Sequence, residues 1–236
     1  MRLLVLILLA LGPISIAASK PQSPEVQIRG SLRQVMHAGD LSAQISLAEL
    51  KSSSHLYAIG AVADLKGEIV VFDSRPYVSS VAEGRLVTDS SFDIEAALLV
   101  WSSVPSWHKV VVPESMDSDT QLAAFVATQA ARLGIDTAQP FPFRISGKID
   151  ELGWHVIDWP KEDSVHTHEK HESAGLHGIL RNENVDIIGF YSNRHQGVIT
   201  HMTSRIHLHV LARDHSLAAH VDLLKLGRGV ALWLPN

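Results

Sequence analysis

Short apolar runs separated by turn residues dominate the pattern of hydrophobic and polar positions along this chain. Runs rich in Val, Ile and aromatic side chains are typical of strands, and clusters of Gly, Pro, Asp and Ser between them are typical of turns. Turns are expected at residues 64–67, 73–76 and 83–85 and at Gly147. Strands are expected at residues 55–62, 68–73, 77–78, 96–101, 109–112, 143–146, 185–191, 205–211, 218–224 and 230–234.

Helical periodicity is clearest over residues 117–133, where a cap at Asp117 or Ser118 precedes the helix and Gly134 ends it. One face of this helix is apolar. It carries Leu122, Phe125, Val126, Ala130 and Leu133.

Two shorter helices are expected near the beginning of the chain. One covers residues 31–37 and stops at Gly39, and the other follows the capping-box pattern of Ser46 and Glu49. Strands outnumber helices and do not alternate regularly with them, so the expected fold class is α+β on mixed or antiparallel sheets. The polar stretch at residues 158–172 is the predicted junction between an N-terminal domain (20–157) and a C-terminal β-rich, metal-binding domain (158–236).

Composition narrows the class of protein. The chain has 236 residues, of which 46% are hydrophobic and 19% charged, so it can bury a sizeable core and is not disordered as a whole. The net charge of −5 excludes the electrostatic footprint of a nucleic-acid-binding protein. The chain has no cysteine, which excludes disulfides, thiolate metal sites and cysteine nucleophiles.

The first nineteen residues are typical of a signal peptide. Arg2 precedes an apolar run at residues 3–11, and residues 16–19 offer small side chains for cleavage. An uncleaved anchor is the alternative, although Gly12-Pro13 interrupts the run. We therefore expect an extracytoplasmic, periplasmic or secreted protein that has no membrane contact after cleavage.

Histidine is distributed unevenly: eleven of the 14 lie in residues 155–236. The most informative stretch is residues 205–224. If Asp214-His215 is a two-residue turn, His209 faces His220, His207 faces Asp222 and Ile206 faces Leu223. One face of this hairpin is then apolar. Its members are Ile206, Leu208, Val210, Ala219, Val221 and Leu223.

The other face of the hairpin carries His207, His209, His220 and Asp222. Opposed residues of paired strands lie within reach of one another, so the three imidazoles can converge on one ion. Three nitrogen ligands with an open position are typical of catalytic zinc, and Asp222 can accept a hydrogen bond from a ligand ring. A solvent-facing sheet that merely carries histidines is the alternative.

A second histidine cluster, His166, His168 and His171, lies in polar sequence beside several acidic residues. Such a cluster in a loop is usually a solvated segment that binds metal weakly at most.

At the hairpin the sequence resembles the bacterial α-acetolactate decarboxylases, whose zinc-ligand spacing it matches at His207, His209 and His220. Residues 186–190, upstream of the hairpin, resemble the strand that enters that segment. Further likeness lies at residues 39–50, at Gly60, at Gly67–Asp73 with Tyr77, and at 143–147. It covers roughly residues 26–235.

The resemblance implies a zinc-dependent carboxy-lyase that converts 2-acetolactate to acetoin and CO₂, with one Zn²⁺ per chain. The metal chelates the ketone and hydroxyl oxygens of this small 2-hydroxy-3-oxo acid and stabilises an enediolate. By the same resemblance Glu68 relays a proton, and Arg144 holds the carboxylate or helps to deliver a proton. A homodimer formed through sheet edges is also implied. From the residues alone, Glu68 could equally be an exposed turn carboxylate and Arg144 a surface charge.

The chain departs from the family pattern in three places. Ala218-Ala219 stands where the family has Gly-Gly, residues 204–206 replace Pro-Gly-Tyr, and residues 223–236 offer no acid in place of the family's second glutamate. Two alternatives therefore stay open. One is a non-enzymatic extracytoplasmic metal- or ligand-binding protein on the same scaffold, and the other is a zinc hydrolase.

Overall fold

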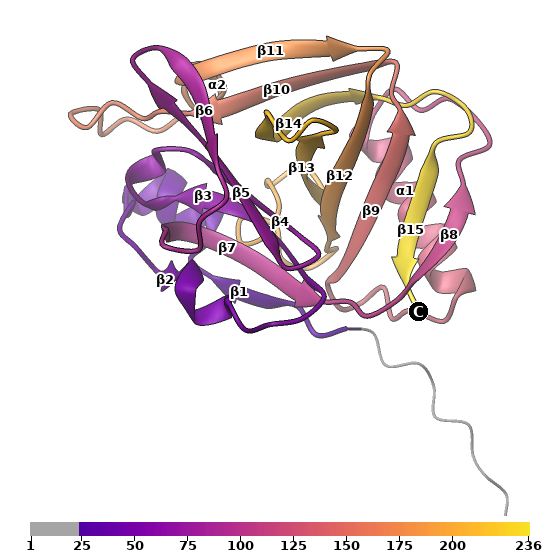
Figure 1. Cartoon of the computed structure of the whole chain (residues 1–236). Helices are drawn as coiled ribbons and strands as arrows, with labels where there is room; N and C mark the ends of the chain where they lie inside the picture. The colour runs from indigo at the N-terminus through magenta and orange to yellow at the C-terminus, as the bar shows by residue number, and fades with distance from the viewer. Residues whose placement is uncertain (1–23) are drawn as a thin grey trace, which may run out of the picture.

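Two antiparallel sheets make up the computed structural model, which describes residues 24–236 (Figure 1). The seven-stranded first sheet has the order β1-β7-β3-β4-β5-β6, and β2 also pairs with β7. Its strands are β1 (Gln27–Arg29), β2 (Ile45–Ser46), β3 (Leu56–Val62), β4 (Glu68–Phe72), β5 (Arg75–Ala82), β6 (Arg85–Asp89) and β7 (Glu95–Ser103).

The chain then passes into the eight-stranded second sheet, with the order β11-β10-β14-β13-β12-β9-β15-β8. In Figure 1, β10 and β11 cross the top of the molecule while β9 and β15 run steeply down its right side, so this sheet twists strongly. Its strands are β8 (Trp107–Val111), β9 (Phe141–Lys148), β10 (Glu151–Ile157), β11 (Gly175–Arg181), β12 (Asn184–Tyr191), β13 (Ile206–Ala212), β14 (Ala218–Lys225) and β15 (Ala231–Pro235).

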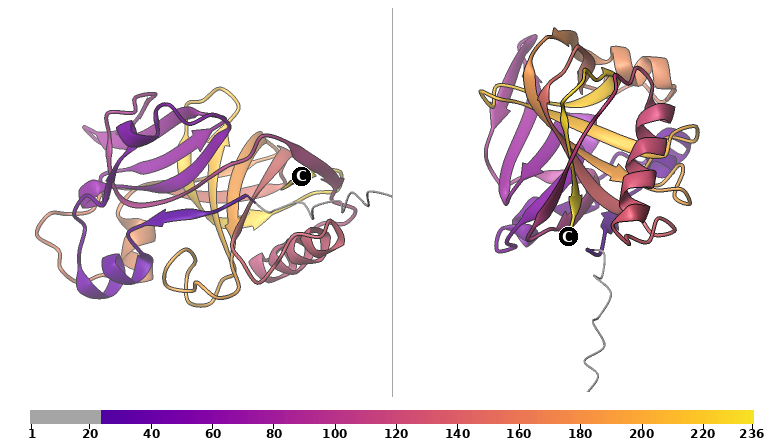
Figure 2. Two further views of the ribbon diagram at one scale, coloured as in Figure 1. Left: turned by 90° about the horizontal axis from the view of Figure 1, so that it is seen from below. Right: turned by 90° about the vertical axis from the view of Figure 1, so that its right-hand side faces the viewer.

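Helices are few. The longest, α1 (Asp119–Arg132), begins where the Ser118 hydroxyl accepts a hydrogen bond from the Gln121 amide. The helix lies beside the second sheet (Figure 2). Its residues Leu122, Val126 and Ala130 are buried in the core cluster that it shares with that sheet. The others are η1 (Gln34–Ala38), η2 (Leu47–Leu50), η3 (Ala63–Leu65) and α2 (His168–Ser173).

The other face of the second sheet packs against the first sheet. Tyr57, Ile59 and Val70 of the first sheet share one buried cluster with Ile188 and Phe190 of the second. This interface brings residues from both halves of the sequence together. The predicted α+β class, with antiparallel sheets and few helices, is confirmed.

Several local predictions were wrong. Gly147 lies inside β9 rather than in a turn, and the polar stretch at 158–172 leads into helix α2. Strands β6, β10 and β11 were not predicted. β10 and β11 contain three glycines between them, which weakens a strand signal in the sequence.

The expected division at residue 158 falls within the second sheet, because β10 pairs with β14 across it. The division of the chain into two domains stays a prediction. The expected signal peptide lies outside the described residues. None of the described helices combines the length and the apolar character needed to span a bilayer.

Candidate metal centre

The histidine hairpin has the predicted register next to its turn. β13 pairs with β14 so that His209 faces His220 and Val210 faces Ala219. The connection is longer than the expected two-residue turn at Asp214-His215, because β13 ends at Ala212 and β14 begins at Ala218. His215 adopts a positive φ of 62° within it. The apolar face of the hairpin, including Leu208 and Val210, is buried against the core under α1, so the strict alternation in the sequence was a sound guide here.

The predicted register fails beyond His220. On β10, Trp154 pairs with Val221 and the adjacent Gly153 pairs with Leu223, so Asp222 is the extra residue of a β-bulge. The two faces exchange after this bulge: Leu223 is 39% exposed and Leu224 is buried. The expected pairing of Ile206 with Leu223 was therefore wrong. The bulge also aims Asp222 at the neighbouring imidazoles.

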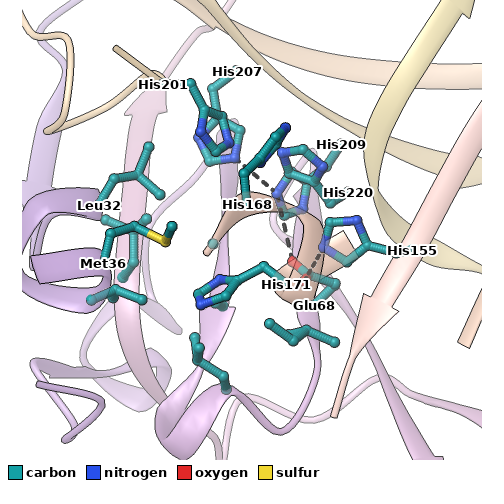
Figure 3. A pocket seen from close by; sticks show the side chains of 16 residues that line it. Leu32, Met36, Glu68, His155, His168, His171, His201, His207, His209 and His220 are labelled. Carbon is teal, nitrogen blue, oxygen red and sulfur yellow. Dashed lines mark hydrogen bonds and ion pairs between the residues drawn. The ribbon is translucent and has the colours of Figure 1, made fainter. Parts of the chain in front are cut away.

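The three predicted ligand histidines lie together between the two sheets (Figure 3). Ring centroids are 5.0 Å apart for His207 and His209, 5.2 Å for His207 and His220, and 5.4 Å for His209 and His220. His207 and His209 are almost completely buried. They point toward the first sheet because His209 pairs with Ile188, a member of the cluster between the sheets.

Two observations fit a metal ion at these rings. The Nε2 atoms of His207 and His209 are 3.3 Å apart. Two tetrahedral ligands with Zn–N distances of about 2.0–2.1 Å span about 3.3–3.4 Å. The same two nitrogens face each other on side chains that are almost completely buried. Two neutral rings in this pose can share only one proton, whereas a cation would accept both Nε2 lone pairs.

The protonation state of these rings also fits a metal. Burial, reinforced by the neighbouring imidazoles, holds the pKa of His207 and of His209 well below the ordinary value. Burial likewise lowers the pKa of His220. These side chains are therefore neutral at pH 7, which is the form that binds a metal ion.

Asp222 connects His220 to a third strand. Its Oδ1 accepts hydrogen bonds from Nδ1 of His220 (2.9 Å) and from Nδ1 of His155 on β10 (2.7 Å). Within residues 24–236, His155, His220 and Asp222 form a group that could hold a metal ion, with donor atoms all within 4.8 Å of one another. These hydrogen-bond lengths also suit a carboxylate that orients both rings and leaves each Nε2 free.

Glu68 enters the same pocket from the first sheet. It begins β4, is 4% exposed, and its carboxylate oxygens lie 3.7 Å from Nε2 of His155 and 3.7 Å from Nε2 of His209. Burial raises the pKa of Glu68 to about 8, against a partial opposing effect of His155. In the metal-free chain the carboxyl group is therefore mostly protonated at pH 7.

His155 has the opposite shift. Burial opposes its charged form, but the hydrogen bond to Asp222, the attraction of Glu68 when its carboxyl is ionised and the charge of Asp222 outweigh burial and raise its pKa. The pKa of Asp222 is lowered, because hydrogen bonds from His155 and His220 outweigh the effect of burial. Asp222 is thus a permanent anion beside the imidazoles.

Arg144 is not among the residues that line this pocket. It shares a sheet row with Ile188 and His209, two strands away, which is about 10 Å between backbones. Its guanidinium lies 4.2 Å from the ring centroid of Phe72, 5.5 Å from that of Trp107 and 3.4 Å from Asp186. The structure therefore brings Glu68, but not Arg144, to the histidines, and a catalytic part for Arg144 stays a prediction.

The pocket wall that faces the histidines is apolar. It includes Leu32 and Met36 (Figure 3). Val35, Leu65 and Leu98 also belong to it. Seven histidines line the pocket, and the lining has no lysine or arginine. They are His155, His168, His171, His201, His207, His209 and His220.

Fold and site together define a two-sheet α+β protein with a histidine-rich candidate metal centre between its sheets. The family model for alpha-acetolactate decarboxylase matches residues 29–232. The chain belongs to this family. No curated protein matches it.

Solved structures share the fold at low identity. The alpha-acetolactate decarboxylase of Bacillus subtilis strain 168 superposes with a TM-score of 0.70 and is 14% identical, over 89% of this chain and 85% of the other. A Staphylococcus aureus protein of unknown function, similar to alpha-acetolactate decarboxylase, gives a TM-score of 0.68 at 14% identity, with the same coverage of 89% and 85%. The acetolactate decarboxylase of Bacillus subtilis subspecies spizizenii gives 0.70 at 14% identity, over 89% and 86%. The likeness to these structures shows the fold alone.

The sequence reasoning missed His155. This residue lies on β10, in which Leu152 and Val156 are buried and Gly153 interrupts the run of larger side chains. His155 and Gly153 lie on the same face of the strand, opposite the buried Leu152 and Val156. Because glycine has no side chain, the sequence did not show this face as polar. His201, in the loop between β12 and β13, carried no periodic signal at all.

Proposed function

We propose that this chain is a carboxy-lyase that converts 2-acetolactate to acetoin and CO₂ with one divalent cation per chain. Zinc is the metal that three imidazoles with an open position suit best, although imidazole also binds copper, nickel and iron. The observation that carries the proposal is the buried carboxyl of Glu68, which stands 3.7 Å from a converging imidazole inside a single pocket. Membership of the decarboxylase family supports it.

The reaction requires two contributions from the protein: stabilisation of negative charge and delivery of a proton. Loss of CO₂ from a 2-hydroxy-3-oxo acid leaves an electron pair delocalised as an enediolate, and a proton must then reach carbon. A cation held by His207, His209 and His220 would supply Lewis-acid stabilisation of the negative charge. Glu68, whose carboxyl lies 3.7 Å from Nε2 of His209, is placed to carry the proton that completes acetoin.

The remaining pocket residues position the ligand rings and exclude water. Asp222 holds the His220 ring by its Nδ1 hydrogen bond. Leu32, Val35 and Leu98 form an apolar wall that suits the methyl groups of the substrate. We also propose an extracytoplasmic location and a homodimer, both of which follow from the expectations drawn on the sequence.

The direct test is an acetoin assay on the metal-stripped chain before and after reloading with zinc. We expect acetoin only from the reloaded protein, and we expect His209→Ala to abolish it. The matched control is His108→Ala, which removes an exposed histidine of β8. Absence of acetoin from zinc-loaded wild type, under conditions in which a characterised decarboxylase of the family works, would refute the substrate assignment.

A second candidate function is metal or ligand binding without catalysis. The pocket lining offers no lysine or arginine for a substrate carboxylate, and Arg144 is occupied by aromatic rings and Asp186. This alternative predicts tight metal binding with no turnover of acetolactate. The same assay, combined with measured zinc content, separates the two functions.

A further inference from the structure

Four histidines outside the hairpin cluster at one side of the pocket in two touching pairs. His166, His168 and His171 lie in or just before α2, and His201 lies in the loop between β12 and β13. Nδ1 of His166 is 2.9 Å from Nε2 of His171, and the ring centroids of His168 and His201 are 4.7 Å apart. The expected solvated loop is therefore an ordered cluster that adjoins the hairpin site.

The first pair has a structural explanation. The rings of His166 and His171 pack on Trp159, with centroid distances of 4.5 Å and 4.6 Å. Trp159 is 1% exposed and belongs to a small buried cluster with Val35 and Leu65. The contacts of this pair with Trp159 hold α2 against the core. Because the facing nitrogens of the two rings bond each other, they are not available as ligands for an ion.

The second pair lacks such an explanation. Nε2 of His168 lies 3.0 Å from Glu172, one helical turn further along α2. A carboxylate on one ring nitrogen of a histidine is the usual partner of a ligand that binds metal through the other nitrogen. His201 faces His168 and lies 6.0 Å, between ring centroids, from His220 of the hairpin. Both rings line the pocket (Figure 3).

The electrostatics of the pocket favour a second cation. Its lining residues include no lysine or arginine, whereas the carboxylates of Asp222 and Glu172 contact the outer ring nitrogens of His220 and His168. Imidazole donors select borderline divalent ions such as Zn²⁺, Cu²⁺ and Ni²⁺ over Mg²⁺ and Ca²⁺.

We propose that the pocket binds a second divalent transition-metal ion, held by His168 and His201, with Glu172 orienting His168. This ion is bound more weakly than the hairpin ion, because two protein nitrogens replace three and the His168 side chain is 53% exposed. The proposal concerns metal binding and does not depend on the reaction assigned above.

The test is a titration of the metal-stripped full chain with ZnCl₂ by calorimetry, with metal content checked by equilibrium dialysis. Wild type should bind two zinc ions per chain, the second at least about tenfold more weakly. His168→Ala and His201→Ala should each reduce the stoichiometry to one and leave the tight constant within about twofold. Glu172→Gln should weaken the second ion about 10–100-fold.

Three controls make the assignment specific. His209→Ala should remove the tight ion and keep the weak one, and His108→Ala should leave both. His168→Gln, which keeps most of the side-chain volume, replaces the alanine variant if that variant fails to fold by circular dichroism. A wild-type stoichiometry of one would overturn the proposal. So would a second ion that survives loss of His168 and His201, or one that is lost with His166→Ala while those two variants keep it.

Discussion

Removal of one hairpin imidazole is expected to abolish the stability that the hairpin zinc ion gives to the fold. A cation that binds only the folded chain adds RT ln(1 + [Zn]/Kd), or about 2.7 kcal/mol when free zinc is about 100 times Kd. For chains of this length, the melting temperature moves by about 2–4 °C per kcal/mol. Wild type should therefore melt about 5–11 °C higher with zinc than after treatment with EDTA.

Two substitutions separate the possible ligand sets. The comparison is made in a His168→Ala background, which lacks the proposed weaker ion. There His209→Ala removes the ring whose Nε2 lies 3.3 Å from that of His207, so the zinc-dependent shift should vanish. Asp222→Asn leaves the three imidazoles but loosens His220, which weakens binding by about 10–100-fold. At the same zinc concentration about 0.4–1.4 kcal/mol remains, a shift of about 1–6 °C.

Differential scanning calorimetry measures each variant against its own metal-free form, which cancels the effect of the substitution on the fold. The opposite ranking would refute the reasoning. If Asp222→Asn or His155→Ala abolishes the shift and His209→Ala keeps it, the ion is held by the His155, His220 and Asp222 group instead.

Three further predictions follow from the geometry and burial. Glu68→Gln should lower kcat for acetoin formation by about 10²–10⁴-fold while KM and the zinc-dependent melting shift stay close to wild type; kinetics with unchanged kcat would remove Glu68 from proton transfer. In metal-free protein, the free energy of unfolding by urea should fall as pH drops from 6.5 to 5. In this range His207 and His209 take up protons in the unfolded chain but not in the folded one, because burial lowers their pKa. Each therefore lowers the free energy of unfolding by up to about 1.4 kcal/mol per pH unit, and Glu68, whose pKa is raised, offsets one such contribution. A His207→Ala/His209→Ala double variant with an equally steep pH dependence would contradict this. Gly60→Ala should destabilise the chain by about 1–3 kcal/mol in urea, because the added Cβ would lie 2.0 Å from the carbonyl oxygen of Leu98; full stability would show that the sheet yields there.

The sequence allowed the hairpin to be placed because its alternation is strict on both strands. A slip of one residue would have put His209 among the leucines, so only one register satisfied both faces near the turn. The same reasoning failed at Asp222, because a bulge depends on the neighbouring strand β10. Periodicity within one segment carries no information about that strand.

The rest of the site arises from tertiary packing. His155 reaches Asp222 only because β10 lies beside β14, and Glu68 reaches the imidazoles only because the two sheets face each other. The family resemblance, rather than any spacing, singled out Glu68 and Arg144. It could not reveal that Phe72 and Trp107 surround the Arg144 guanidinium.

The proposed proton donor and the proposed ligands come from different sheets, with Glu68 on β4 and the three imidazoles on β13 and β14. An ion can therefore be captured by a hairpin that has folded before the sheets have closed on each other. Metal content alone would then overstate the fraction of catalytically competent molecules in a preparation. If the proposed decarboxylase activity is found, its specific activity should therefore be referred to a titration of competent sites and not to bound zinc.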